Sequence, residues 1–88
     1  MKVNSEMGYT ANERLWDRWE SLSPRERDVT ALVCLGYTNR EIAARLNISP
    51  DTVKDRISSV FRKFNINKRN DLRALFSHWD FNEWERQR

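Results

Sequence analysis

One stretch of twenty residues, 38–57, constrains the fold of this chain more than any other. It reads TNREIAARLNISPDTVKDRI and contains two helix-start signals separated by a short break. Thr38 followed by Glu41 forms a capping box, in which the two side chains satisfy backbone N–H groups of the first helical turn. Ser49 followed by Pro50 opens a second helix by the same capping logic. This pattern predicts a helix-turn-helix, a unit that places its second helix in the major groove of DNA.

The second of these helices, predicted over residues 50–64, has one apolar side and one polar side. Its apolar residues recur at helical spacing and are expected to face the core: Val53, Ile57, Val60, Phe61 and Phe64. Lys54, Asp55 and Ser58 lie outside that stripe. We therefore predict that residues 50–64 form a recognition helix whose polar side is free to contact DNA bases.

Similar signals predict the remaining helices of an all-α fold. Ser23-Pro24 starts a helix that Gly36 can end in the left-handed conformation, and Asn47 and Asn65 can end the next two. Another helix should start at Asn70-Asp71 and carry on one side the apolar residues Leu72, Leu75, Phe76 and Trp79.

The predicted domain organisation follows from these helices. Residues 22–79 are expected to form the helix-turn-helix domain, preceded by an accessory helix at 10–21 and followed by a short C-terminal extension at 80–88. Residues 1–9 show no periodic pattern and are expected to be disordered.

The positive charge of the chain is concentrated on the helix-turn-helix region. Residues 22–69 carry ten basic and five acidic side chains, a net charge of +5, whereas the segments before and after each carry −1. A phosphate-binding surface has this footprint, although a solvated basic surface has the same composition. Arg56, Arg62 and Lys63 are candidate contacts to the DNA backbone, with Lys68 and Arg69 as further candidates or parts of a solubilising loop.

Several other classes of protein are not favoured. Cys34 is the only cysteine, so no disulfide can form within the chain, and a lone thiol in an apolar run suggests a reducing, cytoplasmic setting. No apolar stretch approaches the roughly 20 residues that span a bilayer. The chain shows no Cys/His cluster around His78, no glycine-rich phosphate loop and no recognisable catalytic pair of carboxylates. We therefore predict no metal, no cofactor and no enzymatic activity.

A set of short blocks at fixed spacing links the chain to a known family. They are LSPRER at 22–27, Gly36, TNREIAARL at 38–46 and ISPDTVK at 48–54, followed by Ile57, Val60 and Lys63-Phe64. Residues 22–76 thereby resemble the LuxR/FixJ/GerE family of bacterial helix-turn-helix domains. The resemblance implies a four-helix domain whose third helix reads double-stranded DNA and whose fourth often pairs subunits. It implies a sequence-specific transcriptional regulator acting as a homodimer, with RNA polymerase or another regulatory protein as a further candidate partner.

The resemblance also assigns expected roles by position. Lys54, Asp55 and Ser58 fall where such domains touch base edges. Phosphate contacts are implied for Thr38, Asn39, Thr52, Arg56 and Lys63, and pairing of subunits for the helix that carries Leu72, Leu75, Phe76 and Trp79. Arg56 stands where a histidine is usual. Asp55 could accept a hydrogen bond from cytosine, pair with Arg62 or Lys54, or repel phosphate at non-cognate sites.

Two alternatives remain open. The segment TVKDRISSVFRKF also resembles the promoter-reading helix of sigma-factor region four, but INKRNDLRALF predicts a further helix, as in LuxR-type domains. The second alternative is a helical adaptor that binds a protein through the aromatic ends of the chain. Four tryptophans, which the family pattern does not require, would either pack within one subunit or form an exposed patch: Trp16, Trp19, Trp79 and Trp84.

Overall fold

A computed structural model describes residues 11–86, and this part of the chain is entirely helical apart from its turns. The helices are α1 (Ala11–Glu20), α2 (Pro24–Cys34), α3 (Asn39–Leu46), α4 (Pro50–Phe64), α5 (Arg69–Leu75) and α6 (Phe81–Arg86). The predicted all-α fold, with a helix before the four-helix core and a short extension after it, is confirmed. The disorder predicted for residues 1–9 lies outside the described residues.

Local capping chemistry sets most of the helix boundaries. The capping boxes at the starts of α2 and α3 are both formed, from Ser23 with Glu26 and from Thr38 with Glu41. Asn47 and Asn65 take the left-handed conformation at the ends of α3 and α4, with φ of 58° and 55°. As predicted, the turn between α3 and α4 is therefore short, because Asn47 ends one helix two residues before the Ser49 cap of the next.

Both ends of α5 differ from the prediction. The helix ends at Leu75, with Phe76 as its C-cap and Trp79 beyond it. The helix begins at Arg69 rather than at Asn70-Asp71, and Lys68 in the capping position makes no capping hydrogen bond through its side chain. The Arg69 side chain contacts the start of α3, where it donates hydrogen bonds to Asn39 and Tyr37.

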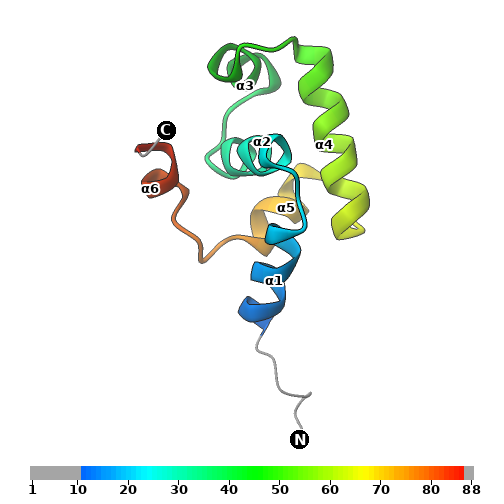
Figure 1. Ribbon diagram of the computed structural model, residues 1–88, viewed down its shortest axis with the longest axis vertical. Helices are drawn as coiled ribbons and strands as arrows, with labels where there is room; N and C mark the ends of the chain where they lie inside the picture. The colour runs from blue at the N-terminus through cyan, green and yellow to red at the C-terminus, as the bar shows by residue number, and fades with distance from the viewer. Residues whose placement is uncertain (1–10, 87–88) are drawn as a thin grey trace, which may run out of the picture.

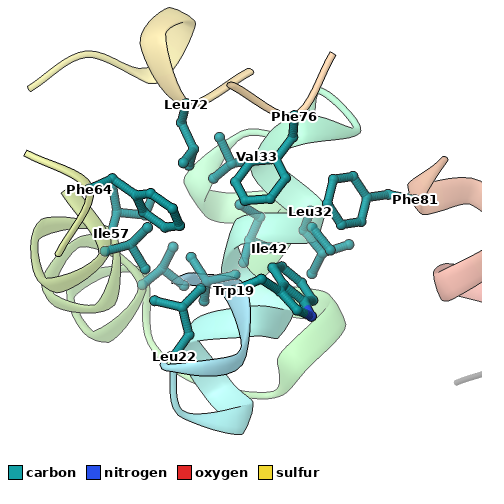
Figure 2. Packing of buried hydrophobic residues seen from close by; sticks show 14 of the residues in the cluster. Trp19, Leu22, Leu32, Val33, Ile42, Ile57, Phe64, Leu72, Phe76 and Phe81 are labelled. Atoms are coloured by element: carbon teal, nitrogen blue, oxygen red, sulfur yellow. The ribbon is translucent and has the colours of Figure 1, made fainter. Parts of the chain in front are cut away.

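Helix α2 lies at the centre of the molecule and packs against α4, α5 and α6, while α3 packs on α4 (Figure 1). The core between them is made of aliphatic side chains with little or no exposed surface, including Val29, Leu32, Ile42, Val53 and Val60. Figure 2 shows Leu32, Val33 and Ile42 surrounded by side chains that include Phe64, Leu72 and Phe76. This core fixes the relative orientation of α3 and α4.

An aromatic cluster joins α1 to the C-terminal part of the chain. The ring of Trp19 lies 5.8 Å from Phe76, 5.6 Å from Trp79 and 5.5 Å from Phe81, measured between ring centroids. Trp84 also packs against the core. Most of the tryptophans therefore pack within one subunit, the first of the two predicted arrangements. Trp16 is the exception, because half of its surface is exposed although it contacts Trp79.

Polar contacts hold both end helices in place. Arg27 of α2 donates to the carbonyl oxygens of Trp19 and Glu20 at the end of α1, at 3.2 and 2.7 Å. Glu85 of α6 accepts a hydrogen bond from the Tyr37 hydroxyl and lies 3.6 Å from the Arg45 guanidinium. Across residues 11–86, none of the helices combines the length and apolar character needed to cross a bilayer.

Candidate nucleic-acid interface

The two sides of α4 are strongly different in exposure. Val53, Ile57, Val60 and Phe64 are buried, with exposed fractions between 0% and 6%. Phe61, which the sequence analysis placed in the same stripe, is only partly buried at the edge of the core. The apolar side thus fixes the helix, and the Ser49 hydroxyl, accepting from the Thr52 N–H, fixes its first turn.

The three predicted base-contacting residues are all exposed on α4. Lys54, Asp55 and Ser58 point away from the core and make no side-chain hydrogen bond or ion pair with any other described residue. In particular, Asp55 pairs with neither Lys54 nor Arg62 within residues 11–86. Their polar groups are therefore available to an incoming ligand, and base contact by them stays a prediction.

The predicted phosphate contacts fall into groups with different surroundings. Arg56 and Arg62 are exposed, and their guanidinium groups have no ion-pair partner in the described part of the chain. Thr38 is exposed, and its hydroxyl oxygen accepts the capping hydrogen bond from the Glu41 N–H. Thr52 is partly buried, with its hydroxyl 2.9 Å from that of Ser49. Like Lys54, the two arginines are therefore exposed cations of α4 that no carboxylate among residues 11–86 engages.

Lys63 has a role that the sequence analysis did not foresee. Its ammonium group lies 2.8 Å from Oε1 of Glu26, a carboxylate only 5% exposed. Ser59, one turn earlier on α4, donates to Oε2 of the same carboxylate at 2.8 Å. The lysine charge is thus engaged in holding α4 against α2, although its side chain remains 43% exposed.

Glu26 therefore acts as a buried acceptor at the junction of α2 and α4. Burial by itself raises the pKa of this carboxyl group, but hydrogen bonds from Lys63, from the Ser23 N–H and from Ser59, with the lysine charge, outweigh burial and lower the pKa to about 2. The capping box was the only sequence signal for Glu26, and it gave no indication of the contacts to α4.

Asn39, at the start of α3, is partly buried and bound to Arg69. The Arg69 guanidinium donates to Asn39 Oδ1 at 2.7 Å and to the Tyr37 carbonyl oxygen at 2.8 Å. Burial, with a smaller effect of the nearby Arg73 charge, lowers the pKa of Arg69. Arg69 was considered as a phosphate contact or a loop residue, and the structure gives it a contact between α5 and α3.

The residues expected to pair subunits are only partly accessible. Leu72 and Phe76 are 1% and 2% exposed and belong to the core of the subunit, and Trp79 is partly buried in the aromatic cluster. Leu75 is 37% exposed, and it and Trp16 are the most exposed large apolar side chains in the described part. Of the residues predicted to pair subunits, Leu75 is therefore the most exposed, and pairing through it stays a prediction.

No metal-binding arrangement is found among the described residues, where no three or more His, Cys, Asp or Glu side chains come together in a way that could hold an ion. Cys34 is partly buried, and burial raises the pKa of its thiol to about 12 despite the opposing effect of the Arg73 charge. The thiol is therefore protonated at neutral pH and is a poor nucleophile.

Comparison with known proteins places this geometry in a family. Residues 20–76 match the GerE family, described as bacterial regulatory proteins of the luxR family. The match begins at the end of α1 and contains α2 to α5. It includes α5, the further helix that favoured a LuxR-type domain over sigma-factor region four.

Individual relatives match over the same region. A Mycobacterium tuberculosis protein whose name describes an HTH-type transcriptional regulator is 44% identical over 54 residues, which cover 61% of this chain and 6% of that protein. The nitrate/nitrite response regulator protein homolog of Haemophilus influenzae is 40% identical over 57 residues, 65% of this chain and 27% of that protein. The response regulator protein TodT of Pseudomonas putida is 40% identical over 58 residues, covering 66% and 26%.

This chain thus spans about a quarter or less of the length of these relatives, all named as regulators. From the arrangement of α2 to α5 and the match over residues 20–76, the chain belongs to the luxR family of bacterial regulatory proteins.

Proposed function

We propose that this chain binds double-stranded DNA in a sequence-specific manner and regulates transcription, without enzymatic activity. The observation that carries the proposal is the exposure of Lys54, Asp55 and Ser58 on α4, whose opposite side is buried. A helix held by its apolar side and displaying donors and acceptors on the other can enter the major groove. Membership of a family of regulatory proteins supports the proposal.

The proposed mechanism divides the polar residues between bases and backbone. Lys54 would donate to guanine O6 or N7, Asp55 would accept from a cytosine amino group, and Ser58 could bond either kind of group. Arg56 and Arg62 would bind phosphates and fix the register of the protein on the duplex. The N-termini of α3 and α4 would add phosphate contacts through Thr38, Asn39 and Thr52 as α3 crosses the DNA backbone.

Truncation of the base-contacting residues tests this assignment. We expect Lys54→Ala and Ser58→Ala each to relax the preference for a particular base pair, by at most about 1–3 kcal/mol. The preference is measured by selecting bound fragments from random duplex DNA for each variant and sequencing them. Because both side chains are exposed, neither change should affect folding.

Arg62→Ala is the matched control from the same helix. Loss of a phosphate contact should weaken binding to all sequences alike and reduce the slope of log affinity against log salt by about 0.9, with no change in the selected sequence. If Lys54→Ala and Ser58→Ala both leave the sequence preference unchanged, the assignment of the reading side of α4 is wrong.

We further propose that the chain acts as a homodimer that pairs through α5, around Leu75. Two α4 helices related by a two-fold axis would then meet two half-sites of a palindromic operator. The exposure of Leu75 supports this part of the proposal, because it places a large apolar side chain on the solvent side of α5, a helix anchored in the core by Leu72.

A protein-binding adaptor is the second candidate, and the half-exposed Trp16 is the observation that favours it. Aromatic residues concentrate at the centres of protein interfaces. The two functions differ in their response to salt: a DNA-binding regulator should bind duplex DNA with a steep salt dependence, whereas an adaptor should show no duplex binding at moderate salt.

A further inference from the structure

Arg69 connects the first residue of α5 to the first residue of α3, thirty positions earlier in the chain. One nitrogen of its guanidinium group donates to Asn39 Oδ1 at 2.7 Å, and a second donates to the Tyr37 carbonyl oxygen at 2.8 Å. Tyr37 and Asn39 flank the capping residue Thr38, so the two contacts span the N-terminus of the helix. Both Arg69 and Asn39 are partly buried.

This contact determines which way the Asn39 amide faces. A guanidinium group has five donors and no acceptor, so it can bind only the oxygen of the amide and never its nitrogen. The Asn39 NH₂ group must therefore point away from Arg69. Within residues 11–86 this NH₂ group has no hydrogen-bond partner, which leaves both of its N–H bonds available.

The surroundings of this NH₂ group favour an anion. It stands at the first position of α3, where the helix dipole is positive; the capping box occupies the N–H groups of Thr38 and Glu41, but those of Asn39 and Arg40 have no acceptor within residues 11–86. The positively charged Arg69 guanidinium lies on the other side of the same amide, 2.7 Å from its Oδ1. Donors and positive charge thus coincide on the helix that would cross the DNA backbone.

We propose that Arg69 is a positioning residue for DNA binding, which holds the Asn39 amide so that both N–H groups are presented to one phosphate. The inference rests on the proposed DNA-binding function and deepens it. Arg69 itself touches no nucleotide in this arrangement: it acts through Asn39. Without Arg69 the amide could rotate freely, and the phosphate contact would lose its fixed geometry.

The test is a double-mutant cycle between Arg69 and Asn39. Binding of a labelled duplex a few helical turns long is followed by fluorescence anisotropy over a series of NaCl concentrations. Asn39→Ala should weaken binding several-fold at every salt concentration and leave the salt slope nearly unchanged, because the amide is uncharged and releases no counterion of its own. Arg69→Met should have a similar effect in the natural background and none when Asn39 is already alanine.

Asn39→Asp distinguishes positioning from a purely structural role. The new carboxylate can still accept from Arg69, so thermal unfolding should be unchanged or occur at higher temperature. It has no N–H to donate and repels phosphate, so DNA binding should fall at least as far as in Asn39→Ala. A contact that mattered only for folding would leave binding intact in this variant.

Arg69→Lys keeps the positive charge but loses the rigid fork of donors that holds the Asn39 amide and the Tyr37 carbonyl group together. It replaces Arg69→Met in the cycle if that variant does not fold. Its weaker binding should also disappear in the Asn39→Ala background. The inference is overturned if Arg69 variants weaken binding by the same factor whether residue 39 is asparagine or alanine. In that case the response of the natural chain to salt and of Lys54→Ala to sequence would still support DNA binding. Absence of any salt-dependent binding by the natural chain would overturn the proposed function and this inference together.

Discussion

Glu26 carries a charge into the interior of a small domain, and three donors make this possible. Its carboxylate accepts from the Ser23 N–H, the Ser59 hydroxyl and the Lys63 ammonium group, each at 2.8 Å. A buried carboxylate without such partners would be strongly disfavoured. Because Ser59 and Lys63 both belong to α4, this side chain ties α4 to α2 in addition to the apolar core.

The lowered pKa of Glu26 makes a prediction about stability and pH. The pKa falls from 4.5 to about 2 on folding, so the unfolded chain binds the proton more tightly. The stabilisation is therefore complete above about pH 4.5 and is lost as the pH falls towards 2, with a magnitude of about 3 kcal/mol. Glu26→Gln keeps the size of the side chain and removes the titrating group.

We expect urea unfolding to show the variant less stable than the natural chain by up to about 3 kcal/mol at pH 7, and the difference to shrink steadily below pH 4.5. The other carboxylates are common to both proteins, so they cancel in the comparison. A difference that stays constant from pH 7 to pH 3 would contradict the role given to Glu26.

At the scale of whole helices, α1 and α6 extend the core beyond the segment that matches the family. Trp19 of α1 is 8% exposed and contacts Phe76, Trp79 and Phe81, whereas Trp16 on the same helix is 50% exposed. Arg18 of α1 also lies 4.7 Å above the ring of Phe64, at the end of α4. The accessory helix is therefore an integral part of the domain.

The two tryptophans of α1 provide a matched pair of variants. Trp19→Ala should destabilise the domain by about 3–5 kcal/mol, because it leaves a large cavity among aromatic rings. Trp16→Ala should cost about 1 kcal/mol, mainly the contact with Trp79. Both values come from urea unfolding at neutral pH. Equal, small effects would mean that α1 does not pack on the core in solution.

The helices could be predicted from the sequence because their signals are local. Ser23, Thr38 and Ser49 cap backbone groups within three residues of themselves, and Asn47 and Asn65 end the helices that precede them. The exposure of Lys54, Asp55 and Ser58 followed in the same way from the spacing of the apolar stripe.

Contacts between residues distant in sequence could not be predicted in this way. Lys63 was expected to be free for phosphate, but it pairs with Glu26, 37 positions away. Arg69 could not be connected to Asn39, and Leu72 could not be assigned to the core rather than to an interface. Each of these outcomes depends on the packing of helices against one another, for which neither a cap nor a periodic pattern gives a signal.

The whole molecule presents its charge and its exposed apolar residues on different parts of the chain. The net charge of +5 belongs to residues 22–69, which contain α3 and α4, whereas the most exposed large apolar side chains of the described residues are Trp16 on α1 and Leu75 on α5. Subunits pairing through the apolar residues would leave both recognition helices free for DNA. A homodimer is thus compatible with the proposed function. Either Trp16 or Leu75 could lie at the centre of its interface.

Substitution of Leu75 and of Trp16 should affect the oligomeric state differently, and this difference tests the proposed interface. Leu75→Glu should convert a dimer into a monomer, because a charge replaces an apolar side chain at the centre of the interface. Trp16→Glu should leave the dimer intact if the pairing runs through α5. Light scattering gives the oligomeric state of each variant, and circular dichroism shows whether the helices are retained.

DNA binding provides a second measurement on the same variants. A monomer meets half of the phosphates that a dimer meets, so the salt slope for a duplex with two half-sites should fall by about half in Leu75→Glu. If this variant stays dimeric while Trp16→Glu dissociates, the subunits pair through α1. That result would place the interface on α1, most of which lies before residues 20–76, the segment that matches the family.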